Sequence, residues 1–208
     1  MQITVFGASG RVGRQVVNLL LDADYAVVAF IHNQNPFEAQ AKVKVVRGSI
    51  TDQAAVSAAI TGSQAVISTL GSWGTPTDNV VSTGTIQIVK AMTNQNLRRL
   101  ITVSGASAFC SQDSPTLQNQ VTHGVLALLM KKILLDGEEH LRTLEASSLD
   151  WTCIRSPAMT GSKSTAYSLV TALASLLASV PRRAVAQCLV DQIKDTTHIM
   201  KAPVIRRG

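Results

Sequence analysis

The residues that most constrain the fold are the first thirteen, Met-Gln-Ile-Thr-Val-Phe-Gly-Ala-Ser-Gly-Arg-Val-Gly. A run of β-forming residues stops at Gly7, and Gly10 and Gly13 follow at three-residue spacing before a helical pattern begins. The order strand, glycine turn, helix is the one that holds the pyrophosphate of a dinucleotide. Gly7 permits the tight turn, Gly10 lets phosphates approach the backbone, and Gly13 lets the helix pack closely on the strand. The segment therefore predicts a dinucleotide site at the start of the chain.

Strand and helix patterns alternate along the rest of the chain. The expected later strands are 25–31, 43–46, 65–69, 100–103 and 150–155. This alternation predicts an α/β fold with a doubly wound parallel sheet, as one domain over residues 1–208. The less regular part from about residue 159 is expected to form a small substrate-side lobe. Ligands of such sheets bind at the carboxyl ends of the strands, so the residues directly after each strand are the site candidates.

Several local predictions concern the helices. Thr51 or Asp52 is expected to cap a helix that follows the third strand. Residues 122–146 read as one long helical region, with Gly137 as the expected point of interruption. The apolar stretch 167–180 is too short to span a membrane comfortably and is predicted to be a buried or partner-facing helix. The final segment, 201–206, is expected to dock on the domain.

Composition and cysteine usage favour a soluble protein of the cytoplasm. The chain has 208 residues, of which 46% are hydrophobic and 15% are charged. No basic segment or cleavage site precedes the first strand, so secretion is not expected. Cys110, Cys153 and Cys188 are far apart and odd in number, which argues against a disulfide framework. No membrane association is expected, and nothing in the sequence selects an oligomeric state.

The formal charge of +6 raises the question of nucleic-acid binding. The basic residues are dispersed rather than clustered, and aromatic residues, which would stack on bases, make up only 4% of the chain. Nucleic acid is therefore not an expected partner. Attraction of an anionic cofactor explains Arg11, within the glycine turn, at least as well.

Four segments of the chain resemble the NAD(P)H-binding atypical short-chain dehydrogenases/reductases. That group includes the NmrA-like regulators and the biliverdin IXβ/flavin reductases. The segments are Gly7-Ala-Ser-Gly-Arg-Val-Gly13, Gly48-Ser-Ile-Thr-Asp52, Ser104-Gly-Ala-Ser-Ala-Phe109 and Ser148-Leu-Asp-Trp-Thr-Cys-Ile-Arg-Ser-Pro157. The resemblance implies a Rossmann fold and binding of NADP(H) more often than NAD(H).

The resemblance also assigns cofactor roles by position. The pyrophosphate would lie on the glycine turn, whose candidates are Gly7, Ser9, Gly10, Arg11, Val12 and Gly13. Ser49 and Ile50 would flank the adenine. The ribose or nicotinamide would be bordered by Leu70, Gly71 and Ser72. The nicotinamide would lie beside Ser104, Ser107 and Pro157.

The residues after the second strand bear on the choice between NADP(H) and NAD(H). Members of the family often have an arginine there to hold the ribose 2′-phosphate, whereas this chain has His32 and Asn33. NAD-specific sites usually present an acid to the 2′-hydroxyl, and residues 30–36 contain none. His32, Asn33 and Arg11 can all donate hydrogen bonds. The local chemistry therefore favours NADP(H) over NAD(H), although His32 and Asn33 also fit a role as plain loop residues.

A typical acid/base pair of short-chain dehydrogenases, Tyr-x-x-x-Lys, is missing. The only tyrosines are Tyr25 and Tyr167, and neither has a lysine four residues later. Reduction of an ordinary ketone needs proton delivery to a developing alkoxide, whereas hydride transfer to a conjugated acceptor relies more on orientation. The prediction is an NAD(P)H-dependent oxidoreductase for a small planar acceptor such as a flavin or quinone, with no catalytic residue assigned. A non-enzymatic redox sensor and an epimerase or dehydratase stay open as alternatives.

Other polar or aromatic residues are candidates for the chemistry. His123 could donate a proton, but a capping or surface role fits it better because the sequence shows it no partner. His140 has no second histidine at the spacing of a zinc site, so no metal is expected. Trp73 could stack on a planar acceptor or cover the edge of the cleft. Lys131 and Lys132 are expected on a solvent-facing side of their helix.

Overall fold

The computed structural model describes residues 1–71, 79–114, 116–171 and 178–208. Within them, one eight-stranded sheet runs through the molecule in the order β3-β2-β1-β4-β5-β6-β10-β8. The strands are β1 (Gln2–Phe6), β2 (Ala26–Ile31), β3 (Val43–Arg47), β4 (Ala65–Ser68), β5 (Arg99–Gly105), β6 (Asp150–Ser156), β8 (Tyr167–Val170) and β10 (Val204–Arg207). The first six follow the 3-2-1-4-5-6 order of the Rossmann fold, as predicted.

All neighbouring strands from β3 to β10 run parallel, and only the edge strand β8 is antiparallel to its neighbour. The register places Phe6 of β1 opposite Phe30 of β2 on one side and opposite Ser68 of β4 on the other. Alternate residues of each strand point to opposite faces. Ile3 and Val5 of β1 therefore enter one core cluster, and Phe6 enters the other.

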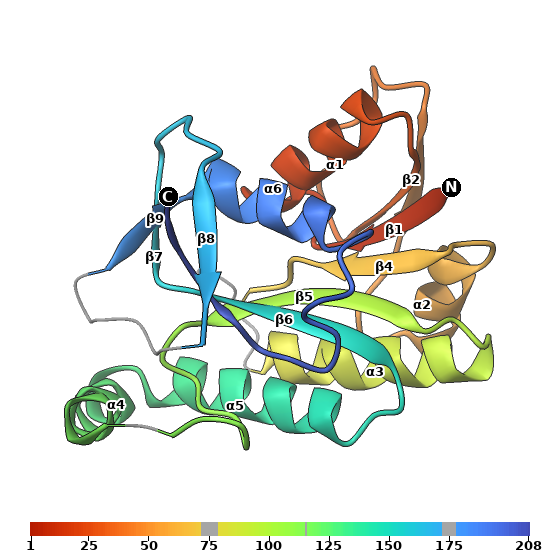
Figure 1. Cartoon of the computed structure of the whole chain (residues 1–208). Coiled ribbons are helices and arrows are strands. Elements are labelled where there is room, and N and C mark those ends of the chain that lie inside the picture. The colour runs from red at the N-terminus through yellow and green to blue at the C-terminus, as the bar shows by residue number, and fades with distance from the viewer. Residues whose placement is uncertain (72–78, 115, 172–177) are drawn as a thin grey trace.

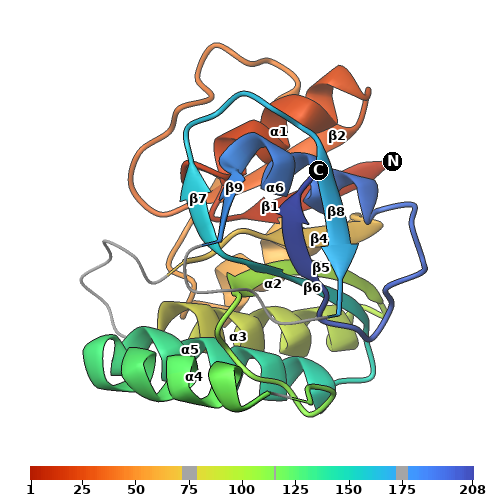
Figure 2. The ribbon, with the colours of Figure 1, turned by 60° about the vertical axis from the view of Figure 1, so that its left-hand side comes forward.

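Helices cover both faces of the sheet (Figure 1). On one face lie α1 (Gly13–Asp22) and α6 (Arg182–Asp191), and on the other lie α2 (Gln53–Ile60), α3 (Val80–Asn94) and α5 (Lys131–Glu145). Helix α4 (Leu117–Leu129) packs beside α5, outside the layer that covers the sheet (Figures 1 and 2). This sandwich of helices and sheet is the doubly wound arrangement expected from the sequence.

The cap of α2 is Asp52 rather than Thr51. The Asp52 carboxylate accepts hydrogen bonds from the backbone N–H groups of Ala54 at 2.9 Å and Ala55 at 3.2 Å. These bonds satisfy two of the donors that every helix start leaves free. The sequence left both residues open, and the geometry decides between them.

The predicted break at Gly137 is wrong. The helical region begins at Leu117 and is divided at Met130, so Gly137 lies inside α5. A Cβ atom on Gly137 would stand 3.2 Å from both Ser104 Oγ and the Ala108 Cβ. Gly137 therefore serves the close approach of α5 to the end of β5, which sequence alone could not distinguish from a break.

The prediction of a helix over 167–180 is also wrong for the residues that the structure describes. Residues 167–170 form β8, which pairs with β10, and Ser179–Pro181 form β9. Tyr167 and Leu169 alternate toward the core, as strand residues do. A second, two-stranded sheet joins β9 to β7 (Ala158–Thr160), and the final segment docks as β10 between β6 and β8. Among the described residues, no helix has the length and apolar character needed to cross a bilayer.

Candidate functional site

The carboxyl ends of β1 to β6 meet at one edge of the sheet because these strands are all parallel. This edge comes forward in Figure 2, with β7 and β9 above it and α4 below. Ser104 of β5 is in register with Arg155 of β6, and Gly105 with Ser156. The residues predicted from the sequence follow these strand ends, so the fold brings their segments to the same edge.

The glycine turn between β1 and α1 requires its glycines. Gly7 has a φ of +69°, and a Cβ there would stand 2.9 Å from the carbonyl carbon of Thr69, which follows β4. A Cβ on Gly13 would stand 2.2 Å from the carbonyl oxygen of Gly7. The Thr69 hydroxyl donates to the carbonyl oxygens of Phe6 at 3.0 Å and Gly7 at 3.1 Å, and so ties the turn to β4. No local pattern in the sequence indicates this role for Thr69.

The turn also offers free donors to a ligand. Within the described part of the chain, the backbone N–H groups of Arg11, Val12 and Gly13 donate to no oxygen, whereas Gly10 N–H donates to Gly7 at 3.0 Å. A Cβ on Gly10 would meet only the Gly7 oxygen, at 3.1 Å, so its outer side is open. Free N–H groups at a helix start bind anions, which is the chemistry that a pyrophosphate needs. The Arg11 side chain is exposed beside them.

The ends of β2 and β3 lie side by side. His32 and Asn33 follow β2 and are both exposed. The Gly48 N–H donates to the Ile31 carbonyl at 3.0 Å, which fixes the start of the next loop. In that loop the Ser49 and Thr51 hydroxyls are 2.8 Å apart and share a hydrogen bond.

An apolar wall connects the loops after β3 and β4. The side chains of Ile50 and Leu70 both lie against Gly84 of α3, where a Cβ would stand 2.8 Å from Ile50 Cγ1 and 2.5 Å from Leu70 Cδ1. Gly71 is exposed and has open space around it. Ser72 and Trp73, which the sequence also predicted here, lie outside the described residues.

The end of β5 carries a buried hydroxyl without a partner. Ser104 Oγ is shielded from solvent by neighbours that include Gly137, yet within the described residues it makes no hydrogen bond. A buried polar atom without a partner is costly, and such atoms in a native structure call for an explanation such as a ligand or an ordered water. Ser107 follows the end of β5 and Pro157 follows the end of β6, and both residues are half-buried.

Behind this edge, α5 is joined to α3 and β5 by a buried polar network that the sequence did not reveal. The Asp136 carboxylate accepts the N–H groups of Val81 at 3.2 Å and Ser82 at 2.8 Å, at the start of α3. One turn later, His140 Nδ1 lies 2.6 Å from Thr85 Oγ1 and Nε2 lies 3.0 Å from Thr102 Oγ1. Burial lowers the pKa of His140 to about 4, so the ring is neutral at pH 7.

A buried ion pair joins β6 to the loop after β5. The Arg155 guanidinium makes two hydrogen bonds to Asp113, at 2.6 and 2.8 Å, and also donates to the carbonyls of Ala202 at 2.8 Å and Ala108 at 3.2 Å. Burial alone would lower the pKa of Arg155, but hydrogen bonding to Asp113 and its charge outweigh that effect and raise the pKa. Arg155 lies inside the motif quoted for the family resemblance, and its contacts here are structural.

His123 has a partner, contrary to expectation. Its Nε2 lies 2.7 Å from Glu138 Oε1, and its ring stacks on Phe109 with centroids 4.3 Å apart. The side chains of His123 and Glu138 are 26% and 15% exposed, so the pair ties α4 to α5. Lys131 and Lys132 are exposed, as predicted.

The cysteines are not poised as nucleophiles. All three are free thiols. Burial raises the pKa of Cys153 to about 12 and that of Cys188 to about 12, and it also raises the pKa of Cys110. A thiol with a raised pKa stays protonated at neutral pH and is a weak nucleophile.

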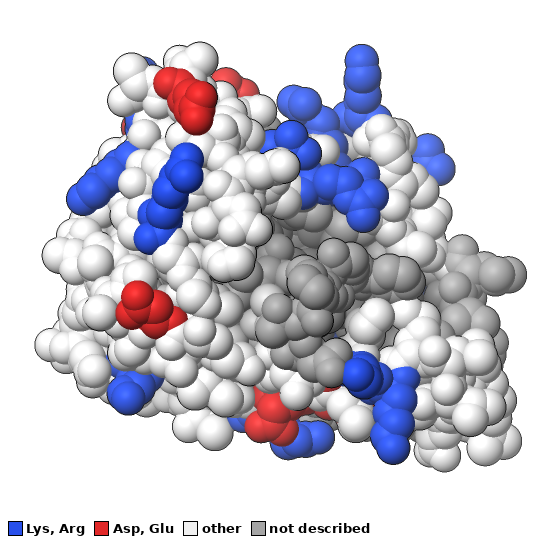
Figure 3. Space-filling model, turned by 180° about the vertical axis from the view of Figure 1, so that it is seen from behind, with Lys and Arg blue, Asp and Glu red and all other residues white. Residues whose placement is uncertain are grey.

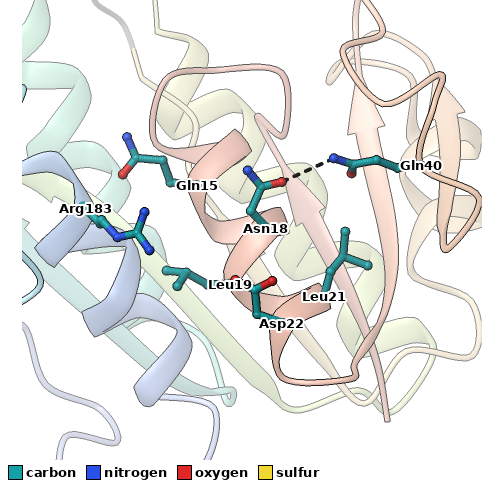
Figure 4. Close-up of a pocket in the computed structure, with 7 residues that line it drawn as sticks. All are labelled: Gln15, Asn18, Leu19, Leu21, Asp22, Gln40 and Arg183. Carbon is teal, nitrogen blue, oxygen red and sulfur yellow. Dashed lines mark hydrogen bonds between the residues drawn. The ribbon is translucent and has the colours of Figure 1, made fainter. Parts of the chain in front are cut away.

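A hollow of about 390 Å³ lies elsewhere, on the surface of α1 between α6 and the segment that joins β2 to β3 (Figure 4). Its lining residues are Gln15, Asn18, Leu19, Leu21, Asp22, Gln40 and Arg183. The Gln40 amide donates to Asn18 Oδ1 at 3.4 Å across it. None of these residues belongs to the site predicted from the sequence.

Basic side chains do not merge into one patch on the face shown in Figure 3. Lys and Arg side chains stand there in separate groups, with uncharged surface between them. Arg11, Arg14, Lys44, Arg47 and Arg183 are all exposed.

A family model described as NAD(P)H-binding matches residues 7–196. The chain belongs to this family. The match begins at Gly7 and includes every strand of the Rossmann sheet from β2 to β6, so the family assignment agrees with the free donors of the glycine turn. The protein is thus a member of an NAD(P)H-binding family.

Solved structures share the fold of this NAD(P)H-binding protein. A short-chain dehydrogenase/reductase from Veillonella parvula DSM 2008 in complex with NADP is similar with a TM-score of 0.81 and 21% identity, over 100% of this chain and 94% of that one. The anaerobillin reductase ChuY from Escherichia coli O157:H7 is similar with a TM-score of 0.78 and 18% identity, over 100% and 98%. The oxidoreductase ylbE from Lactococcus lactis is similar with a TM-score of 0.77 and 20% identity, over 100% of this chain and 91% of that one. At these identities the similarity establishes the fold.

Proposed function

We propose that this protein is an NADPH-dependent reductase of a small, planar, conjugated acceptor such as a flavin or quinone. The observation that carries the proposal is the buried hydroxyl of Ser104, which has no hydrogen-bond partner among the described residues and lies at the carboxyl end of β5, on the same edge of the sheet as the glycine turn. An unpaired hydroxyl there is free to donate to an acceptor carbonyl or to the nicotinamide amide. The anaerobillin reductase and the NADP complex among the structures of the same fold support a reductase that uses NADP(H).

The residues fit the cofactor. The free N–H groups of Arg11, Val12 and Gly13 would hold the pyrophosphate, and the side chains of Arg11 and His32 would favour a 2′-phosphate. The adenine would lie beside Ser49 and Ile50, while Leu70 and Gly71 would border the ribose or nicotinamide. When bound, NADPH supplies a hydride to the acceptor.

The positions of the tyrosines favour a conjugated acceptor. Tyr25 precedes β2 and so belongs to the amino end of the parallel strands. Tyr167 lies on the edge strand β8, and its hydroxyl donates to Asp191 Oδ2 at 2.6 Å. Tyr25 lies at the opposite edge of the sheet, and Tyr167, on the outermost strand, has its hydroxyl bound to Asp191, so neither is expected to protonate an alkoxide beside Ser104. An acceptor that delocalises the added charge and takes its proton from solvent is therefore the better substrate. Ser104 and Ser107 would orient this acceptor, and Pro157 would border it.

The test is steady-state oxidation of NADPH, followed by the absorbance of the reduced nicotinamide, with FMN, a soluble quinone and a simple ketone as acceptors. We expect turnover of FMN or the quinone and none of the ketone. Ser104→Ala should lower kcat about tenfold, the value of one lost hydrogen bond of roughly 1.4 kcal/mol. The exposed Ser148→Ala variant is the control and should match the wild type. Turnover of the ketone alone would contradict the proposal, and tight NADPH binding without any turnover would favour a redox sensor.

A further inference from the structure

Arg47 ends the edge strand β3 beside the end of β2. The register pairs Arg47 with Ile31, the last residue of β2, and His32 follows Ile31 directly. Neighbouring strands of a sheet lie about 5 Å apart, so Arg47 is at the carboxyl edge of the sheet, close to the loop after β2. Residues 32–41 of that loop contain no Lys or Arg. A fixed positive charge at the end of β2 therefore has to come from a neighbouring segment.

The side chain of Arg47 is on the face of the sheet that α1 covers. Val43 and Val45 of β3 pack against the core cluster that contains Val16 of α1, whereas Val46 packs against the other cluster. Side chains alternate along a strand, so Arg47 shares the face of Val43 and Val45. Helix α1 begins at the glycine turn, so Arg47 is on the same side of the sheet as the helix whose start is proposed to hold the pyrophosphate.

The Arg47 guanidinium is available to a ligand. It is exposed and makes no hydrogen bond or ion pair within the part of the chain that the structure describes. Residues 48–51 contain no acid, and the Asp52 carboxylate accepts the N–H groups at the start of α2. Glu38, the only acid between β2 and β3, is exposed and is not paired with Arg47. A guanidinium without a carboxylate partner can make two parallel hydrogen bonds to a phosphate.

We infer that Arg47 binds the 2′-phosphate of NADPH and, together with Arg11, makes the chain selective for NADPH over NADH. The inference rests on the proposed function, in which the pyrophosphate lies on the glycine turn after β1 and the adenine lies beside Ser49 and Ile50 after β3. Strand β2 is between β1 and β3 in the sheet, so the adenosine ribose has to cross the end of β2. This places the ribose between Arg11 and Arg47.

Charged residues on an edge strand can also protect the sheet against pairing with another chain, and Lys44 of β3 fits that role. Lys44 is exposed, pairs with Val28 in the middle of β2, and shares the face of Val46. Three residues of strand, about 10 Å, separate it from Arg47, which is also about the distance over which 0.1 M salt screens exposed charges. Edge protection is therefore common to Lys44 and Arg47, whereas binding of the 2′-phosphate is specific to Arg47.

The experiment is isothermal titration calorimetry of the full chain with NADPH, NADH and 2′,5′-ADP, in the absence of any acceptor. Arg47→Ala should weaken the binding of NADPH and 2′,5′-ADP about tenfold and leave the binding of NADH unchanged, because only the first two carry the 2′-phosphate. Arg47→Lys should restore part of the lost affinity, since an ammonium keeps the charge but not the paired geometry. Lys44→Ala is the matched control and should bind all three ligands like the wild type.

Circular dichroism should show that the variants are folded, since both side chains are exposed. Unchanged NADPH affinity in Arg47→Ala would overturn the inference, and so would an equal loss of NADPH and NADH affinity. The same loss in Lys44→Ala, or equal affinities of the wild type for the two cofactors, would overturn it too. Turnover separates this inference from the proposed function. The expected binding pattern without reduction of any acceptor would contradict the reductase and support the role of Arg47, and turnover with unchanged binding in Arg47→Ala would do the reverse.

Discussion

The glycine turn and the buried polar network behind it hold the same edge of the sheet in opposite ways. The turn is shaped by backbone: Gly7 and Gly13 leave no room for a side chain, and the N–H groups of residues 11–13 have no acceptor within the part of the chain that the structure describes. The second region is shaped by side chains: Asp136 and His140 of the network and Arg155 of the buried ion pair are nearly inaccessible to solvent, and each is held by several hydrogen bonds. The first region should therefore govern ligand binding and the second should govern stability.

The largest expected effect is a loss of stability in the second region. Asp113→Ala removes the carboxylate and leaves the Arg155 guanidinium buried without its counter-ion, which should cost about 3–5 kcal/mol in the free energy of unfolding. Urea denaturation measures this loss. The matched control is Asp150→Ala, which removes the partner of Arg98 in a much more exposed pair and should cost far less. An equal loss of unfolding free energy in Asp113→Ala and Asp150→Ala would contradict the prediction that the buried ion pair matters more for stability than the exposed one.

Next is a substitution that should affect binding alone. Gly10→Asp places a carboxylate where the pyrophosphate is proposed to lie, and NADPH affinity should fall by about 100-fold or more, roughly 3 kcal/mol. The fold should survive with a small adjustment, because a Cβ at this position meets only the Gly7 oxygen at 3.1 Å. Calorimetry measures the affinity, and Gly161→Asp, in open space, is the control. Unchanged affinity in Gly10→Asp would show that the cofactor lies elsewhere.

The third prediction concerns the pH dependence of stability, which His140 in the buried polar network should control. Burial lowers the pKa of His140 from its ordinary value of 6.5 to about 4. Between pH 6.5 and pH 4, His140 is therefore protonated in the unfolded chain and neutral in the folded chain. The stability from neutral His140 is therefore complete above pH 6.5 and is lost as the pH falls toward 4. Between pH 7.5 and pH 5 the loss should be roughly 2 kcal/mol.

Denaturant unfolding at about pH 7.5 and about pH 5 measures this loss of stability. His140→Gln should flatten the pH dependence, while His32→Gln, at an exposed histidine, should leave it as in the wild type. The same slope in His140→Gln and wild type would mean that other groups cause the acid sensitivity.

The smallest effect concerns cofactor choice. NADPH should bind more tightly than NADH, and Arg11→Ala should narrow the difference in affinity about fivefold, roughly 1 kcal/mol, because it removes a charge that we propose to face the 2′-phosphate. Added salt should narrow it too. Arg98→Ala, at an exposed arginine at the amino end of β5, is the control. Equal affinities of the wild type for NADPH and NADH at low salt would contradict the assignment.

The sequence predicted the fold well where the local pattern and the tertiary structure agree. The alternation of apolar strands with helical segments is a local property, and it gave the Rossmann sheet and the position of the glycine turn. It failed at 167–170, where an apolar run fits a helix and a strand equally well, and only pairing with β10 decides for β8. It also failed at Gly137, because a glycine that breaks a helix and one that permits close packing look the same in sequence.

The sequence by itself determined that the chain is an α/β protein with a dinucleotide turn at its start, because glycine spacing and apolar periodicity act over a few residues. Only the tertiary structure decided which side chains support that turn. Thr69, Asp136 and Arg155 find their partners 42 to 63 residues away in the chain. Such contacts depend on strand order and helix packing, which bring distant residues within hydrogen-bonding distance and leave no local pattern in the sequence.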